Sequence, residues 1–211
     1  MSKYSIIALL AAIVLPICML SCSEETEDDN EFANWQQRND DFFNDIYVTA
    51  LNSKDGTWKI IRNYTYNDSV NIDVTDNIVV KVLKEGTGSG SPIYTDSVLL
   101  DYRGRLMPTE SYKDGYVFDQ SYSGEYDPAT AKPVKFMAGQ TVDGFATALQ
   151  HMHIGDRWLV YVPYKIGYGS VSNGSVPAYS TMIFDLALRA YYRSGRSAAP
   201  MLEVKTGWIT E

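Results

Sequence analysis

Apolar side chains recur at every second position through much of the chain beyond Gly56, which is the pattern of strands that bury one face. The alternation is visible in four segments: Val70, Ile72 and Val74; Val98, Leu100 and Tyr102; Trp158, Val160 and Val162; and Met182, Phe184, Leu186 and Leu188. One segment departs from it, because Asp143 can cap a helix there and Gly155 can end that helix. Its apolar residues share one helical face: Phe145, Ala148, Leu149 and Met152. The sequence therefore predicts an α+β fold in which an antiparallel sheet packs on one short helix.

A second helical pattern precedes the strands. Asn30 is a suitable N-cap and Asn52 to Gly56 break the pattern, so we expect a helix over about 31–51. Its apolar residues recur at spacings of three and four: Phe32, Trp35, Phe42, Phe43, Ile46 and Tyr47. We expect this stripe to pack on the main domain, and a dimerisation or partner surface is the alternative.

The first 21 residues have the character of a secretory signal. One cation, Lys3, precedes an apolar run from Ile6 to Leu20 that is too short for a comfortable membrane span. The sequence Met19-Leu20-Ser21-Cys22 resembles the lipobox of bacterial lipoproteins, which implies cleavage before Cys22 and lipidation of its thiol. An uncleaved anchor helix and a plain secretory signal are the alternatives.

The segment after Cys22 is acidic and is expected to be a tether, residues 22–30, because such a composition cannot extend an apolar helix. Two or three acyl chains on one cysteine exceed the single chain that gives only marginal membrane binding. We therefore expect a protein of the cell envelope, lipid-anchored in the outer membrane through Cys22, on its periplasmic or its surface-exposed face.

Composition excludes several classes of function. Of the two cysteines, Cys18 is lost with the signal and Cys22 is taken by lipid, so the folded part forms no disulfide and no thiolate metal site. A formal net charge of -8 leaves no basic stripe for nucleic acid. The only histidines, His151 and His153, fall on different faces of a continuing helix, which argues against a metal site.

Several longer motifs follow one another in the second half of the chain. In order they are Leu100-Asp101-Tyr102-Arg103-Gly104-Arg105-Leu106, Asp114-Gly115-Tyr116-Val117-Phe118-Asp119-Gln120-Ser121, Lys135-Phe136-Met137-Ala138-Gly139, Val142-Asp143-Gly144-Phe145, Ala148-Leu149-Gln150-His151-Met152, Gly155-Asp156, Ile166-Gly167-Tyr168-Gly169, Val176-Pro177 and Ser180-Thr181-Met182-Ile183-Phe184-Asp185-Leu186. In content and order this region resembles the FKBP-type peptidyl-prolyl isomerase domain over about residues 77–190. The resemblance implies an antiparallel sheet wrapped around a short helix, with a proline-binding cleft between them.

The resemblance also assigns roles to residues of the cleft. The catalytic positions it implies are Tyr102, Phe118, Asp119, Val142, Phe145, Tyr168 and Phe184, and the substrate-binding positions are Phe136, Val134 and Val176. In the family the Val142 backbone N–H and the Tyr168 hydroxyl would hold substrate carbonyls, while Asp119 polarises the pocket edge. A dry aromatic slot accepts a pyrrolidine ring and lowers a rotation barrier of roughly 20 kcal/mol by binding the twisted amide, with no nucleophile, metal or cofactor.

Four features depart from the family pattern. Phe145 stands where Trp is usual, Val134 where an aromatic residue is common, and Ser175 where the flap often has an apolar residue, while 121–131 lacks a basic residue. Two hypotheses follow. One is an isomerase that assists folding of exported proteins, with proline-containing polypeptides as clients; the other is a non-catalytic module that binds a partner protein or a proline-containing peptide at the envelope.

The chain is thus divided into a signal (1–21), a tether (22–30), an N-terminal extension of helix then strands (31–76), the FKBP-like domain (77–190) and a C-terminal tail (191–211). The tail either stays loose or adds an edge strand. Two loops, 107–113 and 122–132, are longer than a minimal domain needs and are expected to border the cleft. Client selection and neutral insertion explain them equally well, and the sequence leaves the oligomeric state unknown.

Overall fold

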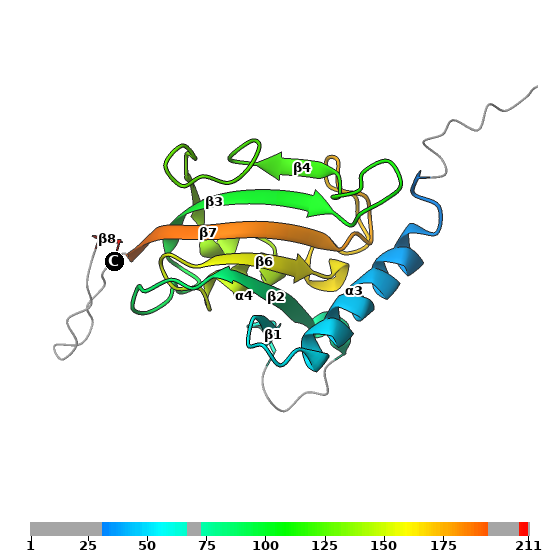
Figure 1. Ribbon diagram of the computed structural model, residues 1–211, viewed down its shortest axis with the longest axis horizontal. Coiled ribbons are helices and arrows are strands. Elements are labelled where there is room, and N and C mark those ends of the chain that lie inside the picture. Colours follow the sequence, from blue (N-terminus) through cyan, green and yellow to red (C-terminus); the bar gives the residue numbers. More distant parts are fainter. Residues whose placement is uncertain (1–30, 67–72, 194–206, 211) are drawn as a thin grey trace, which may run out of the picture. The chain divides into compact units, whose positions relative to one another are not determined.

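The computed structural model describes residues 31–66, 73–193 and 207–210 (Figure 1). The predicted signal, the lipidated Cys22, the acidic tether and the strand positions Val70 and Ile72 lie outside these residues. The part of the chain from Asn34 to Glu211 forms one compact unit. In the described ranges, no helix is both long enough and apolar enough to cross a membrane.

A single antiparallel sheet organises this unit (Figure 1). Its main order is β1-β2-β6-β7-β3-β4, and two strands lie off that path, β5 beside β3 and β8 beside β7. The strands are β1 (Trp58–Arg62), β2 (Asn77–Lys84), β3 (Ser97–Leu106), β4 (Val117–Gln120), β5 (Val134–Met137), β6 (Arg157–Val162), β7 (Met182–Arg193) and β8 (Gly207–Ile209). The predicted strands around Val98, Trp158 and Met182 are confirmed as β3, β6 and β7, and with them the α+β class.

The strand predicted through Val74 is wrong. Val74 begins a short 3-10 helix, η1 (Val74–Asp76), in which Asp73 and Asp76 form a reciprocal capping box. The Asp73 N–H donates to the Asp76 carboxylate at 2.8 Å, and the Asp76 N–H donates to the Asp73 carbonyl at 3.0 Å. These local bonds outweigh the alternation of apolar residues, so the strand begins only at Asn77.

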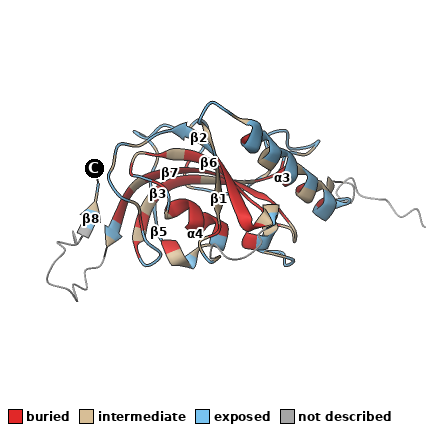
Figure 2. Cartoon of the chain, turned by 90° about the horizontal axis from the view of Figure 1, so that it is seen from below, coloured by how far each residue is buried: buried red, intermediate tan, exposed pale blue. Residues whose placement is uncertain are grey.

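Helix α4 (Asp143–Leu149) lies against the face of the sheet that we call the inner face (Figure 2). A Cβ on Gly144 would collide with the side chain of Val162, so glycine lets the helix approach the sheet closely. The predicted apolar face is confirmed, since its residues are almost fully buried: Phe145, Ala148, Leu149 and Met152.

The predicted ends of α4 are only partly correct. Val142, not Asp143, is the N-cap residue, because its extended backbone (φ −62°, ψ 151°) precedes the first helical residue, and no side chain caps this end. The helix ends at Leu149 rather than close to Gly155. Gly155 has a φ of +92°, a left-handed conformation that glycine adopts without strain, and it turns the chain into β6.

Helix α3 (Trp35–Asn52) covers the outer face of the sheet and leaves its own far side exposed (Figure 2). It begins at Trp35 and not near residue 31, because Asn34 has a left-handed backbone (φ 51°). Phe43 is 1% exposed and packs with Val79 and Tyr161. Packing of the aromatic stripe on the main domain is therefore confirmed for the part that lies in α3, whereas Phe32 precedes the helix and is 45% exposed.

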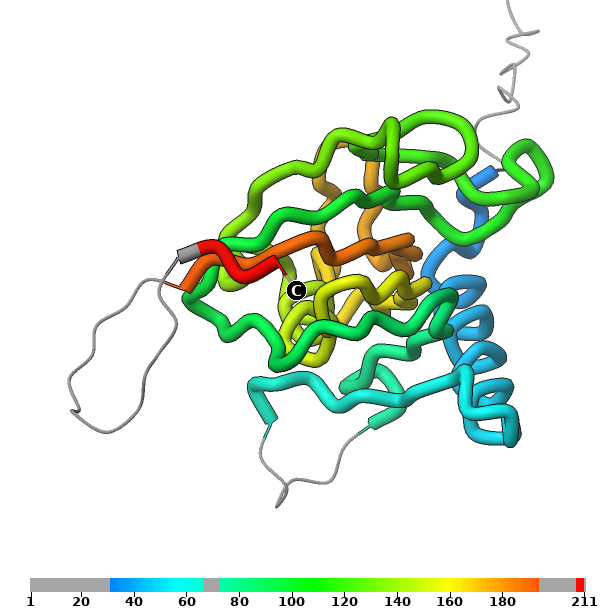
Figure 3. The backbone as a smooth tube through the Cα atoms, turned by 60° about the vertical axis from the view of Figure 1, so that its left-hand side comes forward, coloured from blue at the N-terminus to red at the C-terminus, as the bar shows by residue number. Residues whose placement is uncertain are grey.

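The end of the chain adds an edge strand. β8 pairs with β7 from Tyr191 to Arg193, and the Trp208 ring lies 5.6 Å from that of Tyr192. Figure 3 shows this last segment, in red, alongside β7. Residues 194–206, which connect the two strands, lie outside the described residues.

Candidate functional site

A cleft of about 460 Å³ lies between α4 and the inner side of strands β3, β4, β5 and β7. It is lined by Tyr102, Phe118, Asp119, Phe136, Gln140, Thr141, Val142, Phe145, Tyr168, Asn173 and Phe184. All seven predicted catalytic positions, together with Phe136, are brought to this one place. They come from segments spread over more than eighty positions of the chain, so the fold and not local sequence assembles the site.

Five aromatic rings follow one another around the cleft. Centroid distances are 5.2 Å from Tyr102 to Phe136, 6.2 Å from Phe136 to Phe145, 5.0 Å from Phe145 to Phe184 and 5.7 Å from Phe184 to Phe118. Every neighbouring pair meets edge to face, which contributes about 0.5–1.5 kcal/mol per pair beyond the burial of area. The rings therefore hold one another in place and present an apolar wall to whatever enters.

Gly104 makes this arrangement possible, although the sequence analysis gave it no role. It lies on β3 opposite Asp119 of β4 on one side and Phe184 of β7 on the other. A Cβ at this position would lie 2.5 Å from the Phe118 ring and 3.0 Å from the Phe184 ring. Any larger residue would push Phe118 out of its position, so Gly104 belongs to the site through the space it leaves.

One carboxylate stands at the edge of the apolar wall. The Tyr102 hydroxyl donates to Asp119 at 2.6 Å, and the other carboxylate oxygen accepts the N–H of Gln120 at 2.9 Å. Burial, reinforced by the hydrogen bond to Asp119, raises the pKa of the Tyr102 hydroxyl. The tyrosine therefore stays protonated and keeps donating at physiological pH, which fixes the orientation of Asp119.

Two hydrogen-bond donors border the same space. The carbonyl of Val142 accepts the N–H of Ala146 at 2.9 Å and so begins α4. Within the described ranges, neither the N–H of Val142 nor the hydroxyl of Tyr168 donates to a protein acceptor. Tyr168 is 39% exposed and Val142 also lines the cleft, so both donors are available to a ligand there.

Two predicted positions do not line the cleft. Val134 lies on β5 opposite Leu100 and is 38% exposed, while Val176 is 3% exposed and packs into the core. Three lining residues were missed: Gln140, Thr141 and Asn173. The first two immediately precede the predicted motif at Val142, so the sequence held a signal for them.

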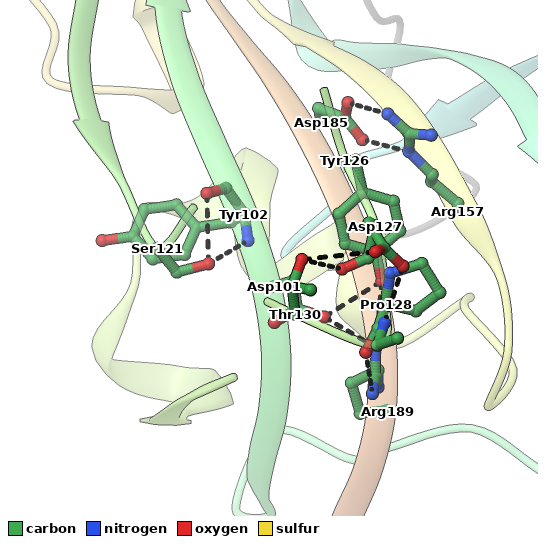
Figure 4. Close-up of polar contacts among 11 residues, drawn as sticks. Asp101, Tyr102, Ser121, Tyr126, Asp127, Pro128, Thr130, Arg157, Asp185 and Arg189 are labelled. Atoms are coloured by element: carbon green, nitrogen blue, oxygen red, sulfur yellow. Dashed lines mark hydrogen bonds and ion pairs between the residues drawn. The ribbon is translucent and has the colours of Figure 1, made fainter. Parts of the chain in front are cut away.

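Neither long loop contributes a residue to the cleft, and the expectation that they border it is wrong. Residues 121–132, which we call the strap, cross the outer face instead (Figure 4). The Tyr126 hydroxyl donates to Asp101 at 3.0 Å, and Arg189 donates to Asp101 at 3.0 Å and to the Pro128 carbonyl at 2.9 Å. Asp101 is fully buried, so its charge needs these partners, and they hold the strap there.

A second buried carboxylate holds the start of the strap. Asp185 accepts two hydrogen bonds from Arg157, at 2.9 and 2.7 Å, and one from the Tyr122 hydroxyl at 3.0 Å. Burial, together with the Asp185 carboxylate, raises the pKa of Tyr122 to about 12. Asp185 is thus a structural carboxylate of the outer face and has no access to the cleft.

The described residues contain no group of three or more His, Cys, Asp or Glu side chains placed to hold a metal ion. The chemistry that the cleft offers comes from aromatic surface, one oriented carboxylate and two free donors.

The chain is similar to known proteins over the region that builds this cleft. A model of the family "FKBP-type peptidyl-prolyl cis-trans isomerase" matches residues 88–189. The "Macrophage infectivity potentiator" of Trypanosoma cruzi is 31% identical over 126 residues, which are 59% of this chain and 58% of that protein. The "FKBP-type 22 kDa peptidyl-prolyl cis-trans isomerase" of Escherichia coli is 32% identical over 109 residues, 51% of this chain and 47% of that protein.

The "Outer membrane protein MIP" of Legionella longbeachae is 34% identical over 109 residues, 51% of this chain and 41% of that protein. The chain thus spans about half the length of these relatives. Among solved structures, a peptidyl-prolyl cis-trans isomerase from Pseudomonas syringae shares the fold, with a TM-score of 0.53, 22% identity and coverage of 75% of this chain and 96% of that one. Residues 88–189 of the chain therefore form a domain of the FKBP-type peptidyl-prolyl cis-trans isomerase family.

Proposed function

We propose that the protein is a peptidyl-prolyl cis-trans isomerase that acts on exported polypeptides and is held at the cell envelope by lipid on Cys22. The isomerase activity is proposed from one observation: five aromatic rings, the Tyr102–Asp119 pair and two free donors meet in the cleft. Relatives named as isomerases support it.

The mechanism requires only differential binding. A prolyl ring enters against Phe136, Phe145 and Phe184, where burial of its apolar surface is favourable. The N–H of Val142 and the hydroxyl of Tyr168 then bind substrate carbonyls. The apolar wall withholds water from the prolyl amide, whose carbonyl is less polar in the twisted state than in either planar isomer, and so the twisted state binds best.

The location of the protein is supported by separate observations. The lipobox-like sequence that ends at Cys22 motivates it, as does similarity to a protein named as an outer membrane protein. Fractionation of cells that express the full chain or Cys22→Ala tests it. Membrane residence of the full chain and its loss in Cys22→Ala support the anchor; equal distribution of the two proteins contradicts it.

Catalysis is tested with the full chain in detergent, in a refolding assay whose slow phase is limited by prolyl isomerisation. We expect the slow phase to accelerate in proportion to protein concentration, and Phe118→Ala to abolish most of that acceleration. A refolding rate unchanged by the protein, with a proline-containing peptide still bound, would show a non-catalytic binding module and contradict the proposal. The smaller ring of Phe145 and the exposed position of Val134 are the features that favour that second reading.

A further inference from the structure

The loop between η3 (Tyr164–Ile166) and β7, residues 167–181, brings Tyr168 and Asn173 to the cleft, and we call it the flap. Its internal backbone bonds are few: Asn173 and Val176 exchange N–H to carbonyl bonds at 2.9 Å, and the Tyr179 N–H donates to the Gly169 carbonyl at 2.9 Å. The Ala178 N–H also donates to the Ser172 hydroxyl at 3.1 Å.

Tyr168 and residues 170–175 of the flap are exposed, with Val171 at 67%, whereas Val176 is 3% exposed and packs into the core. The exposed part of the flap has little packing of its own, so its position depends on Val176 and on the bonds at its two ends.

Helix α3 holds the C-terminal end of the flap. The Trp35 Nε1–H donates to the Ser180 hydroxyl at 2.9 Å, and that hydroxyl donates onward to the Pro177 carbonyl at 2.7 Å. The Thr181 N–H donates to the Asn39 side-chain oxygen at 2.7 Å, while the Asn39 amide donates to the Trp35 carbonyl at 2.7 Å. These groups are buried, with Asn39 at 0% exposed, so a bond lost here cannot be replaced by water.

The 3-10 helix η1 holds the N-terminal end. Lys165, one residue before the last of η3, places its ammonium 2.7 Å from an Asp76 carboxylate oxygen and 3.4 Å from Asp73. The capping box fixes Asp76, whose side chain is only 6% exposed. The flap is therefore held at both ends by segments that precede β2.

The groups that hold the flap share one property: Trp35, Asn39, Asp73 and Asp76 all lie outside residues 88–189, the stretch that the family model matches. Apolar packing also seats α3 on the sheet, through Phe43 and Tyr161. The buried polar bonds add a defined position for the flap, because a hydrogen bond has a direction that apolar contact lacks. We propose that Trp35, Asn39 and Asp76 of the N-terminal extension are positioning residues that set the flap, and through it Tyr168 and Asn173, against the cleft.

Amide hydrogen exchange, followed by mass spectrometry on the full chain, tests the proposal without reference to catalysis. Trp35→Phe keeps a ring but removes the donor, and Ser180→Ala removes the same bond from the flap side together with the bond from Ser180 to the Pro177 carbonyl. We expect exchange in 167–181 to accelerate roughly tenfold in each variant, while α4 and β3 stay protected. The double variant should exchange no faster than Ser180→Ala alone, because Ser180→Ala already removes the bond that Trp35→Phe removes.

Phe43→Leu is the matched control, since it reduces the packing of α3 on the sheet without touching the flap. Its flap exchange should equal that of the wild type. The proposal is overturned if Phe43→Leu accelerates flap exchange as much as Trp35→Phe does, or if Trp35→Phe accelerates exchange equally throughout the sheet.

One further expectation rests on the proposed function. If the flap holds a substrate carbonyl through Tyr168, Trp35→Phe should raise the KM for a prolyl peptide about threefold or more and leave kcat within about twofold. If the chain has no isomerase activity, this kinetic readout is lost, but the hydrogen-exchange experiment still tests the positioning role. Failure of the proposed function can therefore be told apart from failure of the positioning role.

Discussion

The strap (121–132) and the flap (167–181) are surface loops of similar length on one sheet, yet they are held by different means. The strap is fixed by two buried carboxylates, Asp101 and Asp185, each paired with an arginine and a tyrosine hydroxyl. The flap is fixed by neutral hydrogen bonds to Trp35 and Asn39 and by one partly exposed ion pair at Lys165.

This difference between the loops assigns the strap to the stability of the fold and the flap to binding in the cleft. Removing one partner of a buried ion pair costs about 3–5 kcal/mol, whereas an exposed pair contributes about 0–1 kcal/mol. The strap is therefore committed to the outer face of the sheet and takes no part in the cleft. The flap, by contrast, is the loop that supplies cleft residues, and only one of the contacts that hold its ends is an ion pair.

The largest expected effect comes from breaking the strap. Asp101→Asn leaves Arg189 and the Tyr126 hydroxyl without their shared charge, and we expect the free energy of unfolding to fall by about 3 kcal/mol in urea titrations. Glu125→Gln, on the exposed surface of the same loop, should change stability by less than about 0.5 kcal/mol. A loss below about 1 kcal/mol in Asp101→Asn would mean that the strap is not anchored as described.

The next largest effect is expected from a substitution in the cleft itself, which changes neither loop. Gly104→Ala places a methyl group 2.5 Å from the Phe118 ring, and such overpacking costs about 1–3 kcal/mol. We expect kcat/KM for a prolyl peptide to fall about tenfold, since displacement of one ring disturbs the row of edge-to-face contacts. Gly104→Val should be worse than Gly104→Ala. Equal activity in all three proteins would show that Phe118 is not required where the structure places it.

Two tyrosine hydroxyls allow a direct comparison of cleft and strap. Tyr102→Phe removes the bond to Asp119, and Tyr126→Phe removes a similar bond to Asp101. A lost bond to a charged group is worth about 1.5–3 kcal/mol, so we expect Tyr102→Phe to lower kcat/KM at least about tenfold. Tyr126→Phe should lower stability instead and leave kcat/KM unchanged. Equal effects of the two variants on kcat/KM would contradict the separate roles of the cleft and the strap.

The smallest effect concerns the ion pair at the flap. Burial opposes ionisation of Asp76, but Lys165 and the Asp73 N–H outweigh it and lower the pKa of Asp76 below its usual 3.8. A lowered carboxylate pKa stabilises the fold above about pH 4, and this contribution disappears as the pH falls through the lowered value.

Lys165→Met should therefore lower the free energy of unfolding by less than about 1 kcal/mol at pH 7. Below about pH 4 the free energy of unfolding should fall less steeply in Lys165→Met than in the wild type. Lys54→Met, an exposed lysine elsewhere, serves as the control. An unchanged acid limb of the stability curve in Lys165→Met would show that this pair does not fix the flap.

The sheet and α4 were predictable because their apolar periods are strong, as the buried faces of β3, β7 and α4 confirm. The predictions of secondary structure were wrong where local hydrogen bonds or backbone conformation override the alternation of apolar residues. The reciprocal bonds of Asp73 and Asp76 make a 3-10 turn at Val74, and the extended backbone of Val142 takes the capping position expected for Asp143.

The residues of the cleft were predictable from the sequence where their own side chains line it. The rings of the cleft stand in motifs that carry the family resemblance, but the role of Gly104 is visible only once Phe118 and Phe184 are placed around it. The bond from Trp35 to Ser180 joins residues 145 positions apart, and no local pattern announces it. The strap lies where it does because the buried charge of Asp101 needs partners. The alternation of apolar residues places Asp101 on one face of the sheet, but it does not show which residues pair with it.

The central claim is that the cleft accelerates rotation about a prolyl bond. Exchange spectroscopy on a short prolyl peptide at equilibrium tests it most directly, because cis and trans resonances interconvert too slowly to exchange on this timescale unless a catalyst is present. We expect exchange cross-peaks with substoichiometric wild-type protein and their loss in Phe118→Ala. Absence of cross-peaks with the wild type, under conditions where the peptide binds, would contradict the claim.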